Sequence, residues 1–132
     1  MREILFRGKR ADDGEWVCGN LTIWSDKSAS IDKESTEVSP LYAVVPETVG
    51  QYTGLTDKNG KRIFEGDIVA GAVHWLDRMK NGVVAFRDGS FGLIWYRGEV
   101  EQFNPFTSMC NVEYEVIGNI HDNPELLKGG AE

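Results

Sequence analysis

The chain is short of the residues on which metal and redox chemistry depend. It contains two cysteines, Cys18 and Cys110, and two histidines, His74 and His121. No two of these four lie within the roughly two-to-five-residue spacing common in structural zinc sites. Two cysteines cannot build a disulfide framework, and no signal-peptide pattern opens the chain. We therefore predict reduced thiols, no metal, no cofactor and a cytoplasmic location.

Long apolar runs and positive charge are also scarce. No run approaches the roughly 20 residues needed to span a bilayer, so no membrane partner is predicted. The net charge is −7, from 14 basic and 21 acidic residues, which disfavours nucleic acid because phosphate binding depends on cations. Residues 1–10 carry four basic residues against one acid, and acidic residues dominate 97–132. A basic start and an acidic end predict attraction within one chain or between copies.

The chain does contain enough hydrophobic residues to form a core. Hydrophobic residues make up 41% of it and aromatic residues 11%, with 15 glycines available for turns. A chain of 132 residues can bury roughly two thirds of the surface that its unfolded form exposes. We predict a single globular domain over residues 1–132.

The first 24 residues read as a β-hairpin. Apolar and polar residues alternate in REILFRGKR (2–10) and again in EWVCGNLTIW (15–24), and the turn cluster ADDG (11–14) separates them. Two alternating runs around an Asp-Gly turn are a strong hairpin signal. Trp16 and Trp24 share one face, and since both faces carry apolar residues, we expect both to be covered.

The rest of the chain predicts short strands joined by turns. Residues 25–40 contain five serines and read as a flexible loop, and residues 41–127 read as the barrel portion. Within it we expect a type I′ turn at Asn59-Gly60, a polar loop over 76–81, a hairpin across Asp88-Gly89 and an irregular stretch over 97–111. A half-buried strand over 112–120, with Tyr114, Val116 and Ile120 inward, precedes one helical turn over 124–128. The predicted fold is mainly β: a small five-stranded barrel of the Src-homology-3 type, with the N-terminal hairpin packed against it.

Three blocks of sequence carry a resemblance to a known family. They are REILFRGKRADDGEWV (2–17), VVPETVGQYTGLTDKNGKRIFEGDIV (44–69) and YEVIGNIHDNPELL (114–127). With these blocks the chain resembles the YopX family of bacteriophage and prophage proteins. The resemblance implies a small, mostly β protein acting in the bacterial cytoplasm. It implies no catalytic residues that could be transferred to this chain.

The sequence shows little sign of a catalytic site. Nucleophilic catalysis needs a nucleophile beside an oriented base, and no such set stands out. The one acidic pair worth retaining is Glu65 and Asp67 on either side of Gly66. This spacing points both acids the same way on a strand, which suits general acid–base work. Capping of a turn by the same carboxylates is the structural alternative.

We therefore predict a non-enzymatic protein-binding or assembly module that self-associates through the N-terminal hairpin. Its basic segment 2–10 would meet an acidic surface of a neighbour. Three alternatives stay open: a single-stranded nucleic-acid binder built on a small barrel, an acidic mimic of nucleic acid, and an enzyme using the acidic pair. The candidate surface residues are Arg2, Arg7, Lys9, Arg10, Trp16, Trp24, Glu65 and Asp67.

Overall fold

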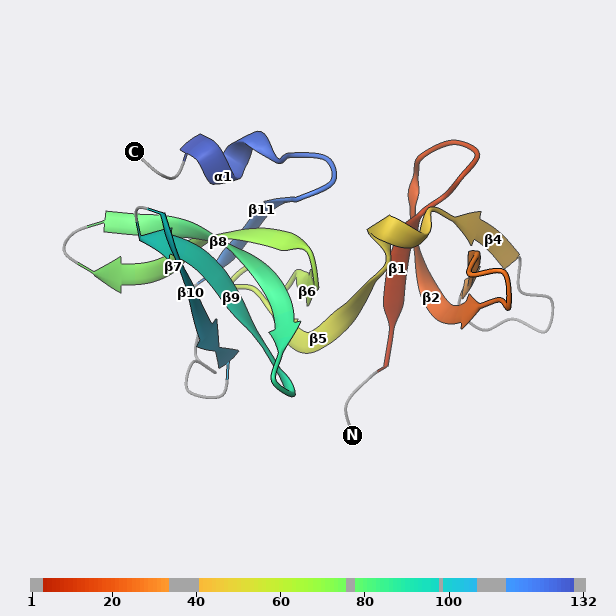
Figure 1. The fold of residues 1–132 in the computed structure, drawn as a ribbon, viewed down its shortest axis with the longest axis horizontal. Helices are drawn as coiled ribbons and strands as arrows, with labels where there is room; N and C mark the ends of the chain where they lie inside the picture. The colour runs from red at the N-terminus through yellow and green to blue at the C-terminus, as the bar shows by residue number, and fades with distance from the viewer. Residues whose placement is uncertain (1–3, 34–40, 76–77, 98, 107–113, 130–132) are drawn as a thin grey trace. The chain divides into compact units, whose positions relative to one another are not determined.

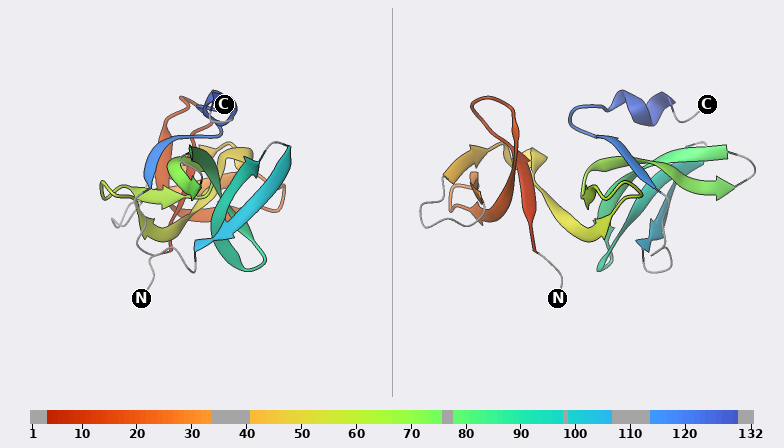
Figure 2. Two further views of the ribbon diagram at one scale, coloured as in Figure 1. Left: turned by 90° about the vertical axis from the view of Figure 1, so that its left-hand side faces the viewer. Right: turned by 180° about the vertical axis from the view of Figure 1, so that it is seen from behind.

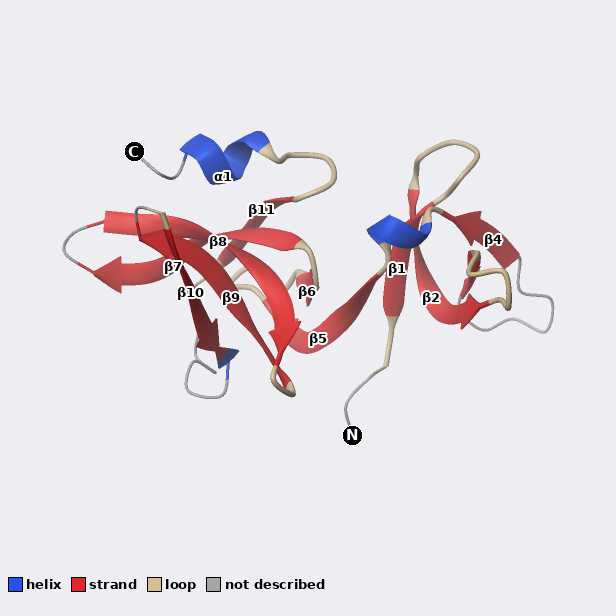
Figure 3. Cartoon of the chain, in the orientation of Figure 1, coloured by secondary structure: helices blue, strands red, loops and turns tan. Residues whose placement is uncertain are grey.

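In the computed structural model, residues 4–33, 41–75, 78–97, 99–106 and 114–129 are described. These residues form eleven β-strands, one 3-10 turn and one α-helical turn (Figures 1 and 3). The chain separates into two compact units, Met1–Gly54 (the N-terminal unit) and Leu55–Glu132 (the C-terminal unit). The predicted mainly β fold is confirmed.

The first sheet has six strands in the order β4-β3-β2-β1-β5-β6, where β6 is Arg62–Phe64, and its first five strands begin in the N-terminal unit. Their bounds are β1 Phe6–Lys9, β2 Trp16–Ile23, β3 Ala29–Lys33, β4 Leu41–Val44 and β5 Gly50–Thr56, with the 3-10 turn η1 Pro46–Thr48 between the last two. β5 pairs with β1 through Gly50 and Gln51 and then carries the chain into the C-terminal unit.

β1 and β2 form the predicted hairpin. They pair antiparallel from Phe6 opposite Gly19 to Lys9 opposite Trp16. Gly14 in the turn has a φ of 74°, a left-handed conformation that glycine adopts without steric cost. The turn is local in sequence, which is why its residues alone predicted it.

The predicted flexible loop over 25–40 is wrong for residues 29–33, which form the strand β3. Ile31 is completely buried, at 0% exposure, and Ala29 and Ser30 are buried beside it. β3 pairs with β2 on one side and with β4 on the other, so its backbone groups are bonded within the sheet. A single isoleucine among polar residues is too weak a pattern to reveal a central strand. Residues 34–40 lie outside the described ranges.

β4 belongs to the N-terminal unit, whereas the prediction assigned residues 41–54 to the barrel portion. It pairs with β3 along its length, and its opposite edge is bonded to the residues that follow β1. The unit boundary therefore falls after Gly54. The sequence missed it because these partners lie far upstream of β4. Three contacts join β4 to the residues around the end of β1. They are an Arg10–Val44 bridge, a hydrogen bond from Val45 N–H to Lys9 O at 2.8 Å and one from Ala11 N–H to Ala43 O at 2.9 Å.

The C-terminal unit holds a five-stranded antiparallel sheet in the order β10-β9-β8-β7-β11. Its elements are β6 Arg62–Phe64, β7 Asp67–Trp75, β8 Arg78–Arg87, β9 Ser90–Arg97, β10 Val100–Pro105, β11 Glu115–Asn119 and the helical turn α1 Glu125–Gly129. α1 lies beside the sheet, where the side-chain amide of Asn81 donates to Leu126 O at 3.0 Å (Figure 2). The predicted helical turn is confirmed, while the closed five-stranded barrel and the packing of the hairpin on it stay predictions.

The two predicted turns of this unit have different outcomes. β8 and β9 pair across Asp88-Gly89, and both turn residues have positive φ, 51° and 82°, as a type I′ turn requires. At Asn59-Gly60 the prediction of type I′ geometry is wrong, because only Gly60 of the pair has positive φ. The side chain of Asp57 holds this second turn in a different shape.

Two predicted irregular stretches of the C-terminal unit prove to be strand. β8 already begins at Arg78, within the predicted polar loop over 76–81, and residues 100–105 of the predicted irregular stretch form β10. β10 pairs with β9 from Val100 opposite Arg97 to Pro105 opposite Gly92. Polar residues in both segments hide the alternation, and Pro105 stands at the end of an edge strand, where proline is tolerated.

The core of the C-terminal unit lies on one face of its sheet. Val69, Val84 and Leu93 are almost fully buried there, with Tyr114 and Val116 packed beside them as predicted. The predicted inward position of Ile120 is wrong. A bulge between Val116 and Gly118 shifts the alternation of β11, and Ile120 is exposed.

Gly92 on β9 lies close against residues 103–105 of β10, and replacing it with alanine is expected to destabilise the C-terminal unit. A Cβ there would lie 2.6 Å from Phe103 Cζ and 2.8 Å from Pro105 Cα, and the latter cannot rotate away. We expect a loss of about 3 kcal/mol in urea unfolding. The matched control is Gly89→Ala in the adjoining turn, where a Cβ meets nothing within 4 Å and positive φ alone costs about 1 kcal/mol. Equal losses in the two variants would contradict the close approach.

Candidate functional site

One face of the β1–β2 hairpin carries a cation–aromatic cluster. Arg7 and Lys9 lie two residues apart on β1 and so share a face, and Trp16 stands opposite Lys9 in the ladder. The guanidinium carbon of Arg7 is 4.7 Å from the ring centroid of Trp16, and Lys9 Nζ is 5.8 Å from it. Both distances are within the range of cation–π attraction. Three predicted surface residues therefore meet in one place, which we call the hairpin cluster.

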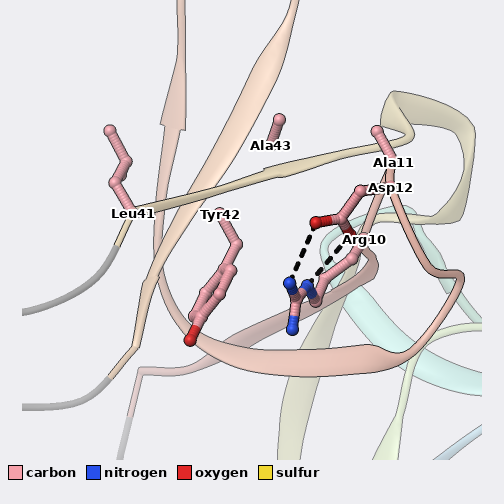
Figure 4. Close-up of a pocket in the computed structure, with 6 residues that line it drawn as sticks. All are labelled: Arg10, Ala11, Asp12, Leu41, Tyr42 and Ala43. Carbon is pink, nitrogen blue, oxygen red and sulfur yellow. Dashed lines mark hydrogen bonds and ion pairs between the residues drawn. The ribbon is translucent and has the colours of Figure 1, made fainter.

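Arg10 makes different contacts. Its guanidinium lies 4.3 Å from the ring centroid of Tyr42 on β4. Its Nε donates to Asp12 Oδ1 at 3.1 Å and its Nη2 donates to Asp12 Oδ2 at 2.9 Å, which makes a two-bond fork (Figure 4). Its Nη1 is 3.3 Å from Asp13 Oδ2. The guanidinium is thus held between an aromatic ring and two carboxylates.

The charges of this turn compensate one another. The hydrogen bond between Arg10 and Asp12 is the main cause that raises the pKa of the Arg10 guanidinium and lowers the pKa of the Asp12 carboxyl. With Asp13 included, the turn has one positive and two negative side chains, so its formal charge is −1. The sequence predicted Arg10 as part of the basic segment 2–10. In the structure, the carboxylates of its own turn compensate its positive charge.

A cavity opens between this turn and the start of β4. Its volume is about 330 Å³, enough for one or two amino-acid side chains. Figure 4 shows Arg10 and Asp12 on one wall and the β4 residues on the other, with the side chains of Leu41 and Tyr42 pointing to opposite sides of the strand. We call this cavity the β4 notch, lined by Arg10, Ala11, Asp12, Leu41, Tyr42 and Ala43.

Trp24 lies at the end of β2, apart from the hairpin turn. Its indole Nε1 donates to the hydroxyl of Ser30 on β3 at 3.0 Å, and 47% of the residue stays exposed. The preceding Ile23 is 58% exposed. The hydrogen bond fixes the orientation of an aromatic ring that water still reaches. Arg2, the last predicted surface residue of this unit, lies outside the described ranges.

Of the acidic pair in the C-terminal unit, Asp67 caps a turn. Asp67 is 1% exposed, and its Oδ2 accepts a hydrogen bond from the Phe64 backbone N–H at 2.7 Å. That bond closes the tight turn around Gly66, whose φ is 92°. Glu65 is half-buried in the same turn. Capping of a turn, the structural alternative of the sequence analysis, therefore describes Asp67.

A buried carboxylate that the sequence did not single out, Asp57, joins two distant segments. Its Oδ1 accepts from the backbone N–H groups of Asn59 and Lys61, and its Oδ2 accepts from Val116 N–H on β11, at 2.8, 2.9 and 2.9 Å. Burial opposes its ionisation, but the bonds from Val116, Lys61 and Asn59 outweigh it and lower the pKa of the carboxyl. The Asp-x-Asn-Gly pattern indicated a turn; nothing local indicated the bond to β11.

The described parts of the chain contain neither a cluster of metal ligands nor a membrane-spanning helix. There, no three His, Cys, Asp or Glu side chains lie close enough together to hold a metal ion. The same residues contain no helix that is long and apolar enough to cross a membrane. Cys110 lies outside the described ranges, and the prediction of no metal stays a prediction.

Fold and surface together define an all-antiparallel β protein of two units, with cation–aromatic contacts and a small cavity on the first. A family model described as YopX protein matches residues 5–128, and the chain belongs to this family. The crystal structure of protein EF1440 from Enterococcus faecalis is similar to it. The two are 28% identical with a TM-score of 0.55, over 96% of this chain and 99% of that chain. No curated protein matches the chain.

Proposed function

We propose that the chain is a non-enzymatic protein-binding or assembly module of a phage or prophage, acting in the bacterial cytoplasm. The observation that carries the proposal is the apolar surface of the N-terminal unit. This unit has its own core of Val17, Ala29, Ile31 and Val44. It nevertheless exposes five further large apolar side chains: Ile4, Ile23, Trp24, Leu41 and Val45.

Exposed apolar side chains in such number favour a protein partner. Single exposed apolar residues are ordinary, whereas neighbouring ones are typical of interaction surfaces, and Ile23 and Trp24 are adjacent. Trp24 is the strongest candidate anchor, since tryptophan is enriched among the residues that dominate binding energy. Its bond to Ser30 orients the ring in advance, which reduces the entropy lost on association.

The charges favour a second copy of the chain as that partner. Arg7 and Lys9 of the hairpin cluster present two cations on a protein whose net charge is −7. A neighbouring copy offers the acidic surface that such cations attract. The contact between copies should therefore weaken as salt is added.

Self-association is tested by light scattering over a range of concentrations at low and high salt. We expect oligomers at low salt, with Trp24→Ala requiring about tenfold more protein to associate. Phe86→Ala is the matched control, because Phe86 is an aromatic residue of similar exposure in the C-terminal unit. A monomer at every concentration, or equal effects of the two substitutions, would remove the support for this interface.

Single-stranded nucleic acid is a second candidate, favoured by the cation–aromatic contacts of the hairpin cluster. Bases stack on aromatic side chains while cations hold the backbone phosphates. A labelled oligonucleotide at about 50 mM salt gives the test, because such contacts are strongest at low salt. Without salt-sensitive binding, this candidate fails.

We also propose that the sheet of the C-terminal unit is of the Src-homology-3 type. Support comes from the strand order, in which β7 to β10 follow one another as a meander and β11 returns to pair with β7. This architecture by itself names no ligand.

A further inference from the structure

The β4 notch lies where a ladder of backbone hydrogen bonds ends. Val45 N–H bonds to Lys9 O and Ala11 N–H bonds to Ala43 O, so residues 43 and 45 direct their backbone groups toward the end of β1. Leu41 precedes Ala43 by two residues, and the strand period directs its backbone groups to the same side. There, however, the opposing chain leaves the ladder and enters the Arg10–Glu15 turn, closed by Arg10 N–H to Glu15 O at 2.8 Å.

We propose that the β4 notch receives an extended, basic segment of a protein partner. The segment adds to the edge of β4 at Leu41 and continues the ladder that Ala11 begins. One of its lysine or arginine side chains enters the notch beside Tyr42 and Asp12. The inference rests on the proposed role as a protein-binding module and specifies the chemistry of the partner.

Charge selects a basic segment over an acidic one. The guanidinium of Arg10 already donates to both oxygens of Asp12 and faces Asp13, so these three side chains together carry a formal charge of −1. The net charge of the chain, −7, acts in the same direction. An incoming carboxylate or phosphate would meet two carboxylates and a cation that is already engaged, whereas an incoming ammonium would be attracted.

The shape of the notch suits a long basic side chain. A cavity of about 330 Å³ holds a lysine or arginine stem together with neighbouring backbone. The ring of Tyr42, on which Arg10 already packs, provides a flat wall for that stem. Leu41, 55% exposed on the opposite side of β4, provides apolar surface for the next residue of the added segment.

The probe is a labelled peptide of about eight residues that alternates valine and lysine, titrated into the full chain and followed by fluorescence anisotropy. We expect it to bind, and the same peptide with glutamate in place of lysine not to bind. Methylation of alternate backbone nitrogens should weaken binding about tenfold, because a strand added at an edge depends on its N–H groups. Equal binding of the methylated peptide, or no binding of the lysine peptide, would overturn the proposal.

Matched variants separate the notch from general attraction to an acidic protein. Asp12→Asn is expected to weaken peptide binding about fivefold to tenfold. Asp26→Asn changes the net charge equally in the β2–β3 turn, where Asp26 accepts from Ser28, and should leave binding unchanged. Equal weakening by both would overturn the assignment. Light scattering without peptide measures self-association alone. If self-association is not found, peptide binding still tests the notch, and the reverse also holds.

Discussion

Replacing Asp57 with alanine is expected to lower the free energy of unfolding of the C-terminal unit by about 4 kcal/mol. The residue is 6% exposed, and its two oxygens accept three backbone hydrogen bonds, two from its own turn and one from β11. Alanine would leave those N–H groups without their acceptor, and the N–H of Val116 lies where water reaches poorly. Urea unfolding at neutral pH, with hydrogen exchange to locate the loss, measures the effect.

Asp26→Ala is the matched control for this prediction. Asp26 also accepts from a backbone N–H and a hydroxyl two residues on, but it lies exposed in the β2–β3 turn. Water can replace the lost acceptor there, so stability should change little. If both substitutions gave the same small loss of stability, the hydrogen bond from Asp57 to β11 would not contribute to stability.

The Asp57 variant also carries a pH dependence whose sign follows from its lowered pKa. A carboxyl whose pKa is lower in the folded chain contributes its stability above the unfolded pKa of about 3.9. That contribution disappears as the pH falls through the folded pKa. The difference in stability between the native chain and Asp57→Ala should therefore be full at pH 7 and shrink below about pH 4. A constant difference from pH 7 to pH 2 would contradict this assignment.

Replacing Ile31 with alanine is expected to destabilise the N-terminal unit by about 3.5 kcal/mol. Ile31 has 0% exposure and belongs to a core cluster that contains three other buried residues among those described. A cavity in so small a core has few neighbours that can move to fill it. Denaturation followed by the circular dichroism of the sheet gives the measurement.

Ile23→Ala provides the matched control for Ile31→Ala, because it removes the same atoms from the neighbouring strand. Ile23 is 58% exposed, so we expect a loss below about 1 kcal/mol. The pair of variants also tests whether residues 29–33 form a core strand rather than part of a flexible loop. In a flexible loop neither substitution would affect stability, and that outcome would remove β3 from the core.

Hairpins were the part of the fold that local sequence predicted well. The Asp-Gly turns at 13–14 and 88–89 lie between alternating runs, and each turn brings neighbouring segments together. A turn depends on the φ angles of a few adjacent residues, so its signal is complete within them. Arg7, Lys9 and Trp16 meet for the same reason, since one hairpin ladder places them on one face.

Strands whose partners are distant were missed. β3 and β10 contain polar residues and show little alternation, and each becomes a strand because a neighbouring strand accepts its backbone bonds. The β4 notch needs Arg10 beside Tyr42, two residues far apart in sequence. Nothing near Arg10 indicated that an aromatic ring would lie beneath it.

By itself, the sequence determined that this is a mostly β protein of the YopX family with two recognisable hairpins, and it located the cations and aromatics of the hairpin cluster. Only the tertiary structure decided that residues 29–33 lie in a core, that Asp57 reaches β11, and that two carboxylates compensate Arg10. The physical reason is one of range. Turn geometry and strand alternation are set by adjacent residues, whereas burial and charge compensation depend on which distant segments share the sheet.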